Sequence, residues 1–306
     1  MKDIIIIGAG PAGMTAALYA LRADKSVLLL EKENFGGQIT YSPRLENYPS
    51  VMEISGNEFA NLMLEQVMNH GAEIELAEAT EIKNMGDYKT VCTEYGDFDG
   101  RAVIIATGSK HRHLGLPGEE ELIGNGISFC AVCDGSFFAD KNVAVIGGGN
   151  TALQEAVMLS DICKKVTLIQ NLSFMTGERR LLNILEEKNN VDMIFDTVVT
   201  GLENKSGELS AILLQNTKTQ TESRFELDGM FIAIGQAPEN EAFKNISELD
   251  SYGYIVSDEN CLTDTEGVFV AGDCRTKRIR QVTTATADGA IAALAACRYI
   301  DGLSVK

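Results

Sequence analysis

The chain has 306 residues, 45% of them hydrophobic, and a formal net charge of −18 at pH 7. This length and hydrophobic content allow one large or two ordinary domains with buried cores. The acidic balance argues against a broad nucleic-acid-binding surface, and no run of about 18 apolar residues predicts a membrane span. The apolar run in the N-terminal MKDIIIIGAG is too short for a secretory signal, so we expect a cytoplasmic protein.

Two segments align without a gap when the sequence is shifted by 139 residues. Residues 2–31 read KDIIIIGAGPAGMTAALYALRADKSVLLLE, and residues 141–170 read KNVAVIGGGNTALQEAVMLSDICKKVTLIQ. Each segment predicts a short buried strand, a glycine turn, a helix rich in Ala and Leu, and a second strand. The sequence therefore predicts the same βαβ unit twice.

Both glycine turns have the spacing of a dinucleotide-binding fold. The first reads GAGPAG from Gly8 to Gly13, and the second reads GGGNTA from Gly147 to Ala152. Small residues here allow a tight turn, the approach of a pyrophosphate to the backbone, and close packing of helix on strand. The helix N-terminus then offers free N–H groups to the phosphate. One such motif is weak, but two at matching offsets between strand and helix argue against a chance match.

The two units differ at the end of the second strand. Glu31 lies where an acid would accept hydrogen bonds from an adenosine ribose, and Gln170 takes the matching place in the second unit. Asn171, Leu172 and Ser173 add no arginine that could meet the 2′-phosphate of NADP. We therefore expect an adenine dinucleotide site in the first unit, and a second nucleotide fold whose recognition groups are missing.

The remaining elements suggest that the second unit is an insertion. VIIATG (residues 103–108) and FIAIG (residues 231–235) predict similar strand-to-turn elements that close the two halves. GVFVAGDC (residues 267–274) predicts a strand that ends near Asp273, followed by an alanine-rich helix over residues 283–300. Asp273 is a candidate ligand for a ribose or ribitol hydroxyl, or only a cap. The predicted fold is α/β with two Rossmann-like nucleotide-binding domains, one of residues 1–115 with 241–306 and one of residues 116–240.

FCAVCDG (residues 129–135) contains the only C-x-x-C pair among seven cysteines, an odd number that does not resemble a secreted disulfide framework. Three interpretations compete: two structural thiols, half of a zinc site, or a redox dithiol. Zinc lacks a second pair of ligands. A redox dithiol is favoured because a neighbouring dinucleotide site offers a matching two-electron couple. Asp134 could exchange protons with the thiolate of Cys133, or only cap a helix.

Together with GGQITYSPRLENYPS (residues 36–50) and RQVTTATADGAIAA, these motifs make the chain resemble the low-molecular-weight thioredoxin reductases over essentially its whole length. The resemblance implies FAD as the cofactor, thioredoxin as the partner, and a homodimer. It also implies a middle domain that rotates, so that the cysteine pair alternates between the flavin and thioredoxin.

The resemblance also implies roles for single residues. Cys133 would face the flavin and take its electrons, Cys130 would attack the thioredoxin disulfide, and Asp134 would serve as the acid. No metal site is expected. The residues assigned to FAD binding are Gly8, Gly10, Pro11, Ala12, Gly13, Glu31, Gly37, Gln38, Asn47, Thr107, Gly108, Gly272, Asp273, Arg280 and Gln281.

The chain departs from the family where NADPH-dependent members carry His-Arg-Arg. Here that segment reads Gln170-Asn171-Leu172, and a further arginine of the pattern falls on Thr176. Losing three charged hydrogen bonds to a 2′-phosphate, at about 1.5–3 kcal/mol each, would weaken NADPH binding by orders of magnitude. In this feature the chain resembles a variant group that takes electrons from reduced ferredoxin, and we expect ferredoxin as the donor.

Other donors and functions stay as alternatives. Arg179 and Arg180 lie close enough in sequence to replace the missing arginines for NADPH, and NADH needs no such contact. A redox-sensing flavoprotein without turnover is a further alternative, although CAVCDG and the linkers argue against it. An acidic ferredoxin would need a local basic patch on this acidic chain. The candidate groups are Lys110, Arg112, Lys164, Lys165, Arg275, Lys277, Arg278 and Arg280.

Overall fold

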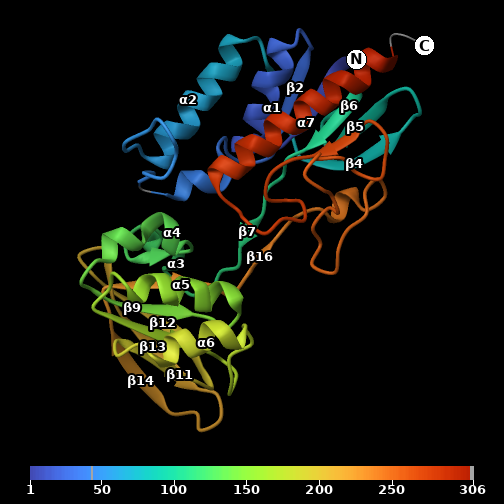
Figure 1. Ribbon diagram of the computed structural model, residues 1–306. Coiled ribbons are helices and arrows are strands. Elements are labelled where there is room, and N and C mark those ends of the chain that lie inside the picture. Colours follow the sequence, from blue (N-terminus) through green and yellow to red (C-terminus); the bar gives the residue numbers. More distant parts are fainter. Residues whose placement is uncertain (43, 304–306) are drawn as a thin grey trace. The chain divides into compact units, whose positions relative to one another are not determined.

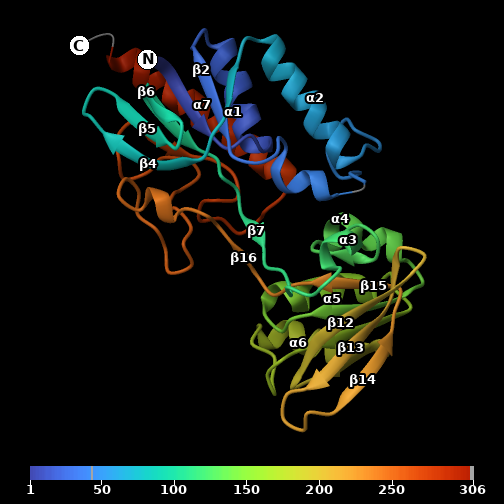
Figure 2. The ribbon, with the colours of Figure 1, turned by 180° about the vertical axis from the view of Figure 1, so that it is seen from behind.

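The computed structural model describes residues 1–42 and 44–303. It divides into two compact units, the first made of residues 1–110 with the chain from residue 237 on, and the second of residues 111–236. The connecting segments run side by side as the short strands β7 (Lys110–His111) and β16 (Gln236–Ala237) (Figures 1 and 2).

These boundaries precede those predicted from the sequence by five residues (115 against 110) and by four residues (240 against 236). Side-chain packing explains the difference. Leu114 and Leu116 pack against a core of the second unit. Asn240 belongs to the first unit, where its amide donates hydrogen bonds to the carbonyls of Gly253 and Cys274. Neither contact can be inferred from the positions of the prolines in the sequence.

The first unit is built on a seven-stranded sheet of order β3-β2-β1-β6-β5-β4, with β17 paired to β6 outside this path. The long β6 pairs antiparallel with β5 through its first half, and parallel with β1 and β17 through its second half. The strands are β1 (Lys2–Ile7), β2 (Val27–Glu31), β3 (Glu73–Leu76), β4 (Ala79–Asn84), β5 (Lys89–Thr93), β6 (Gly96–Ile105) and β17 (Val268–Val270).

The unbroken apolar runs of β1 and β2 arise because central parallel strands are buried on both faces. Ile4 and Ile6 of β1 face the core that contains α1 (Pro11–Arg22) and α7 (Val282–Leu303). Ile5 and Ile7 face a second core, which contains Phe243 of the 3-10 helix η3 (Glu241–Phe243). Two cores therefore fix the sheet from which the nucleotide turn projects.

Helix α7 packs along α1 in this unit, and α2 (Gly56–Asn69) packs on the other side of α1 (Figure 1). Small residues permit the close approach of α7, since a Cβ on Gly289 would lie 2.2 Å from the carbonyl oxygen of Ala12. The contact brings the first half of α7 against the first turn of α1. The 3-10 helix η1 (Gly37–Tyr41) lies between β2 and α2 in the chain.

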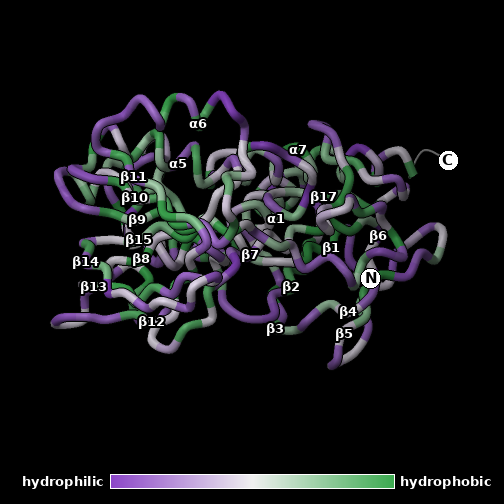
Figure 3. Tube along the Cα trace, turned by 90° about the horizontal axis from the view of Figure 1, so that it is seen from below, coloured by the Kyte–Doolittle hydropathy of each residue, from purple (hydrophilic) through white to green (hydrophobic). Residues whose placement is uncertain are grey.

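The second unit repeats the parallel βαβ pattern in a five-stranded sheet of order β11-β10-β9-β15-β8, which a three-stranded antiparallel sheet accompanies. Hydrophobic colour follows the central strands such as β9, and hydrophilic colour follows the outer loops (Figure 3). The strands are β8 (Ile127–Ser128), β9 (Asn142–Ile146), β10 (Lys165–Ile169), β11 (Val191–Ile194), β15 (Gly229–Ile232), and the antiparallel β12 (Thr197–Lys205), β13 (Glu208–Asn216) and β14 (Glu222–Glu226). The helices are α3 (Glu119–Leu122), α4 (Ala131–Asp134), the 3-10 helix η2 (Gly135–Phe138), α5 (Asn150–Ser160) and α6 (Arg179–Glu186).

The predicted α/β fold with two Rossmann-like units is confirmed, because each repeat forms a β-strand, a helix and a parallel neighbouring strand. Within the described residues, none of the helices is both long enough and apolar enough to span a bilayer.

Candidate functional site

The presence of glycine has a different explanation at each of three positions in the first turn. Gly8 has φ of +104°, and a Cβ there would lie 2.4 Å from the carbonyl oxygen of Ala106. A Cβ on Gly13 would lie 1.8 Å from the carbonyl oxygen of Gly8, so helix and strand pack closely here. A Cβ on Gly10 would meet nothing closer than the carbonyl oxygen of Gly36, 3.9 Å away. The protein itself does not require glycine at this position, whereas an approaching pyrophosphate does.

The start of α1 completes the anion site. Gly10 is the N-cap residue and makes no side-chain cap, and Pro11 occupies the first turn. The N–H groups of that turn are therefore directed at the space beside Gly10. Gly37 approaches the same place, because its Cβ position lies 3.7 Å from the Cα of Gly10. Gln38 follows in η1 and is exposed.

Glu31 closes β2 beside the turn, as predicted. Its Oε2 accepts a hydrogen bond from the Ala9 N–H at 2.8 Å, and its Oε1 accepts one from the Glu33 N–H at 2.8 Å. A carboxylate has further lone pairs for a ribose hydroxyl. Glu31 also lines a cavity of about 390 Å³, within the size range of small-molecule sites. The other lining residues are Ile7, Gly8, Leu30, Lys32, Ala77, Glu78, Ala79, Thr107, Glu239, Glu241, Ala242 and Phe243.

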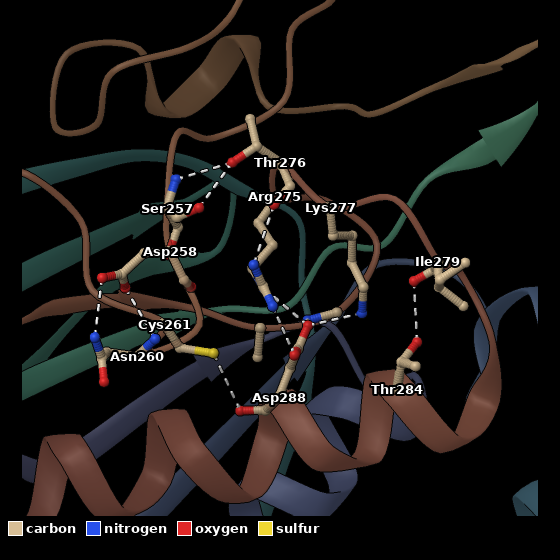
Figure 4. Close-up of polar contacts among 12 residues, drawn as sticks. Ser257, Asp258, Asn260, Cys261, Arg275, Thr276, Lys277, Ile279, Thr284 and Asp288 are labelled. Carbon is tan, nitrogen blue, oxygen red and sulfur yellow. Dashed lines mark hydrogen bonds and ion pairs between the residues drawn. The ribbon is translucent and has the colours of Figure 1, made fainter.

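The turn that follows β17, residues 272–277, is held on α7 by Asp288 (Figure 4). The Asp288 carboxylate accepts hydrogen bonds from the Gly272 N–H at 3.1 Å, from both Nε and Nη2 of Arg275 at 2.9 Å, and from Lys277 Nζ at 2.9 Å. Burial raises the pKa of Asp288, but the hydrogen bonds from Arg275 and Lys277 outweigh it, and the pKa is lowered. The ionised Asp288 thus fixes the turn that carries Asp273.

Asp273 offers an unused acceptor to a ligand. Its buried Oδ1 has no hydrogen-bond partner among the described residues, and Lys277 Nζ lies 3.8 Å away. Burial raises the pKa of Asp273 to about 6, against the opposing charges of Lys277 and Arg280. A buried acceptor without a partner is costly in the protein alone, which fits a hydroxyl donor from a bound cofactor.

Three more predicted ligands, Asn47, Arg280 and Gln281, have partners within the first unit. Asn47 Nδ2 donates to Gln281 Oε1 at 3.3 Å. The Arg280 guanidinium lies 4.2 Å from the ring centroid of Tyr254, and its Nε donates to the Asp273 carbonyl oxygen at 3.4 Å.

Two further predicted ligands follow β6, and a third joins the turns. Thr107 donates through its hydroxyl to Asn240 Oδ1 at 3.0 Å, and Gly108 has φ of +71°. Gly272 meets α1, since its Cβ position lies 2.8 Å from the Cβ of Ala12. The first unit thus joins the turns at Gly8, Gly37 and Gly272, and this arrangement fits an adenine dinucleotide cofactor.

Cys130 and Cys133 form a disulfide at the ends of the first turn of α4, and both are partly exposed. Val132 between them is 56% exposed, so a partner can reach this turn. Asp134 Oδ2 accepts a hydrogen bond from the Ser128 hydroxyl at 2.6 Å. Burial raises the pKa of Asp134, against the effect of that hydrogen bond. An acid with a raised pKa beside a disulfide suits proton transfer to a thiolate.

The second glycine turn meets a side chain of its own chain. Gln170 is 5% exposed, and a Cβ on Gly148 would lie 2.3 Å from its Nε2. The Gln170 amide is engaged in its own loop, because Nε2 donates to the Phe174 carbonyl oxygen at 3.3 Å and Oε1 accepts from the Asn171 N–H at 3.1 Å. In the first unit the equivalent place holds Ala9, whose N–H binds the Glu31 carboxylate.

Sequence reasoning missed two acids, Glu155 and Asp288. Glu155 Oε1 accepts a hydrogen bond from the Ala131 N–H at 3.4 Å, so it meets the dithiol turn from α5. Glu155 is three residues after the buried Ala152 and four before the buried Leu159, and this helical spacing could have identified it as an inward-facing acid. Asp288 likewise stands among buried alanines of α7.

Comparisons with known proteins agree on the family. Residues 2–289 match the family of pyridine nucleotide-disulphide oxidoreductases. The thioredoxin reductase of Bacillus subtilis is 40% identical over 98% of this chain and 95% of its own length. A protein of Clostridium pasteurianum described as a 34.2 kDa protein in rubredoxin operon is also 40% identical, over 98% of this chain and 97% of its own.

A solved structure extends the similarity to three dimensions. The crystal structure of thioredoxin reductase from Streptococcus pyogenes matches with a TM-score of 0.94 and 40% identity over 99% of both chains. FAD is the cofactor of this family, and the site around Gly10, Glu31 and Asp273 fits it. The chain belongs to the pyridine nucleotide-disulphide oxidoreductase family and, within it, to the low-molecular-weight thioredoxin reductases.

Proposed function

We propose that the protein reduces the disulfide of thioredoxin with its Cys130–Cys133 dithiol, and that the electrons come from reduced ferredoxin. The observation that carries the donor assignment is the Gln170 amide, which lies against Gly148 and is bonded into its own loop. The dithiol assignment is supported by the disulfide on an accessible turn beside a buried acid.

The chemistry divides between the cofactor and the chain. FAD, when bound, accepts electrons singly or in pairs and delivers a pair to a disulfide. Gly8, Gly10 and Gly13 would place its pyrophosphate at α1, with Glu31 and Asp273 on its hydroxyl groups. Arg280 and Gln281 would complete the site.

The dithiol then exchanges with thioredoxin in two steps. The Cys130 thiolate attacks one sulfur of the thioredoxin disulfide, which forms a mixed disulfide and releases the other sulfur as a thiolate. The Cys133 thiolate attacks Cys130, which restores the Cys130–Cys133 disulfide and releases the second thioredoxin thiolate. Two electrons and two protons pass to thioredoxin, and Asp134 holds one of the protons, with its carboxyl oriented by Ser128.

Two features of the second Rossmann unit support a donor other than a pyridine nucleotide. The side chain that meets the turn at Gly148 is an amide rather than an acid, and the sequence from Gln170 to Thr176 contains no cation. Arg179 and Arg180 lie at the start of α6 with exposed side chains, and Arg179 pairs with Glu186 at 3.1 Å. Neither arginine directly follows Gln170, as the missing His-Arg-Arg segment would, and Arg179 would have to give up its pair with Glu186 to meet a 2′-phosphate.

Fewer of the candidate basic residues are accessible to a ferredoxin than the sequence suggests. Arg275 is 7% exposed and, with Lys277, is paired to Asp288, so neither is available for docking. Lys110 pairs with Glu33 and Glu239. Arg278 and the neighbouring Ile279, which is 61% exposed, stay accessible in this segment.

The working form is proposed to be a cytoplasmic homodimer. The five cysteines outside the disulfide are free thiols, as expected for a reducing compartment. These residues are Cys92, Cys163, Cys261, Cys274 and Cys297.

The donor is tested by the absorbance of the bound flavin under anaerobic conditions. Excess NADPH or NADH should leave the flavin oxidised, and photoreduced ferredoxin should bleach it and sustain thioredoxin reduction. Cys133→Ser should keep the flavin reducible by ferredoxin but abolish thioredoxin reduction. Rapid bleaching by NADPH would assign the donor to the pyridine nucleotide, and turnover by Cys133→Ser would overturn the dithiol route.

A further inference from the structure

Two carboxyl groups from different elements meet the turn that carries the dithiol. Asp134 ends α4 and is fixed by the Ser128 hydroxyl at 2.6 Å. Glu155 reaches the same turn from the middle of α5, where its Oε1 accepts the Ala131 N–H at 3.4 Å. Ala131 directly follows Cys130, so Glu155 contacts the backbone between the two cysteines.

Each carboxyl group has one oxygen that makes no hydrogen bond within the described residues. Asp134 Oδ1 and Glu155 Oε2 are both buried, and neither has a hydrogen-bond partner in the described part of the chain. An ionised carboxylate in this condition is poorly stabilised, whereas a protonated one has an O–H to donate. The two oxygens are therefore places where protons can reside.

The charges around Glu155 favour its protonated form. Burial raises the pKa of Glu155 to about 7, the hydrogen bond from Ala131 opposes the rise, and the negative charge of Asp134 adds to it. The other elements that pack on α5 place no buried charge beside Glu155. β9 has none, and the charged side chains of β10 and α6 are exposed: Lys165, Arg179, Arg180 and Glu186.

We propose that Glu155 is the second proton carrier of the dithiol, acting through Asp134, so that the two carboxyl groups together hold the two protons that pass to each reduced disulfide. This rests on the proposed reduction of thioredoxin. In each cycle two thiolates leave from thioredoxin, and each takes one proton. Asp134 supplies the first and is reprotonated by Glu155 in time for the second, and both carboxyl groups recover their protons from solvent. The electrons come from the dithiol, which returns to the disulfide.

The competing role for Glu155 is structural, since its Oε1 binds the first N–H of α4. Glu155→Gln separates the two roles, because the amide oxygen still accepts the Ala131 N–H while the group can no longer exchange a proton. Glu155→Asp restores an exchangeable carboxyl. Glu222→Gln, an exposed position on β14, is the matched control for loss of one glutamate charge in the same unit.

The test uses the FAD-loaded protein reduced with dithiothreitol, freed of reductant, and mixed anaerobically with oxidised thioredoxin from pH 5.5 to 8.5. The carboxyl is protonated below about pH 7, so the proton-dependent step of wild type should slow as the pH rises through that value. Glu155→Gln should lose this inflection and be about a hundredfold slower at pH 6, the lower end of general-acid effects. Glu155→Asp should regain an inflection, and Glu222→Gln should match wild type. A Glu155→Gln profile identical to wild type would show that Glu155 acts only as the acceptor of the Ala131 N–H and carries no proton.

A spectroscopic readout does not depend on turnover. Infrared difference spectra between the oxidised and the reduced protein should contain a protonated-carboxyl band that Glu155→Gln loses and Glu222→Gln keeps. Persistence of the whole band in Glu155→Gln would overturn the proposal. Should wild type fail to reduce thioredoxin, the proposed function fails instead. The pH series is then repeated with 2-hydroxyethyl disulfide, whose alkyl thiolate products also need protons.

Discussion

The Gln170 side chain lies over Gly148, in the glycine turn of the second Rossmann unit. In the repeat at the N-terminus, Glu31 instead accepts the N–H of Ala9 at the matching turn. The two units share one backbone pattern but present opposite hydrogen-bonding groups, an acceptor in the first and an engaged amide in the second.

A methyl group at position 148 tests this contact. Gly148→Ala would force the Gln170 amide out of two hydrogen bonds, and we expect a loss of about 1–2 kcal/mol in the free energy of unfolding. Gly148→Ala combined with Gln170→Ala should cost less than the sum of the single changes, because the clash is already removed. Urea denaturation measures all three. Gly149→Ala is the control, since the nearest atom to its Cβ position is 3.8 Å away. Strict additivity would contradict the contact.

Gly10 and Gly13 should separate cofactor binding from folding. Gly10→Ala meets no protein atom closer than 3.9 Å, so it should fold normally but bind FAD more weakly. Gly13→Ala would bring a methyl group to 1.8 Å from the Gly8 carbonyl oxygen, and should destabilise the protein by about 1–3 kcal/mol or more. FAD titration of the apoprotein and urea unfolding distinguish the two effects. Unchanged FAD affinity in Gly10→Ala would place the pyrophosphate elsewhere.

Asp288 should be costly to neutralise. Asp288→Asn leaves Arg275 without its carboxylate partner and leaves Lys277 with only Asp273, 3.8 Å away, and the side chains of Arg275 and Lys277 are each 8% exposed. Removing one partner of a buried pair costs about 3–5 kcal/mol. Asp301→Asn is the matched control, because Asp301 is 64% exposed in its pair with Lys25 and should cost about 0–1 kcal/mol. Thermal unfolding of both variants with FAD bound gives the comparison, and equal costs would argue against the importance of the buried cluster.

His111 should make the protein less stable in acid. Burial lowers its pKa from 6.5 to about 4, and the neighbouring His113 adds to the effect. The unfolded chain therefore binds more protons between those values, and stability falls as the pH drops through them. The difference between the two pKa values corresponds to up to about 3 kcal/mol at pH 4. His111→Gln should flatten this pH dependence of urea unfolding, and His70→Gln, at an exposed histidine, should not. An unchanged slope in His111→Gln would show that another group is responsible.

The sequence alone determined the fold and the principal chemical groups. Glycine spacing and unbroken apolar strands are local consequences of backbone geometry and burial, so GAGPAG and IIII could be interpreted without coordinates. The C-x-x-C pair and Glu31 follow from the same logic, because their neighbours in the chain fix their position. The presence of Gln170 at the second turn could also be identified, since a missing charge is visible in the sequence.

Only the tertiary structure decided which long-range partners these groups meet. Asp288 and Gly272 are 16 residues apart, and Glu155 and Ala131 are 24 apart, yet each pair is joined by a hydrogen bond. It also decided that Arg275 and Lys277 are inside rather than on a docking surface. The reason is that burial and the pKa of a carboxyl depend on atoms brought together by packing of helices on sheets, and no local pattern specifies which helix face meets which turn.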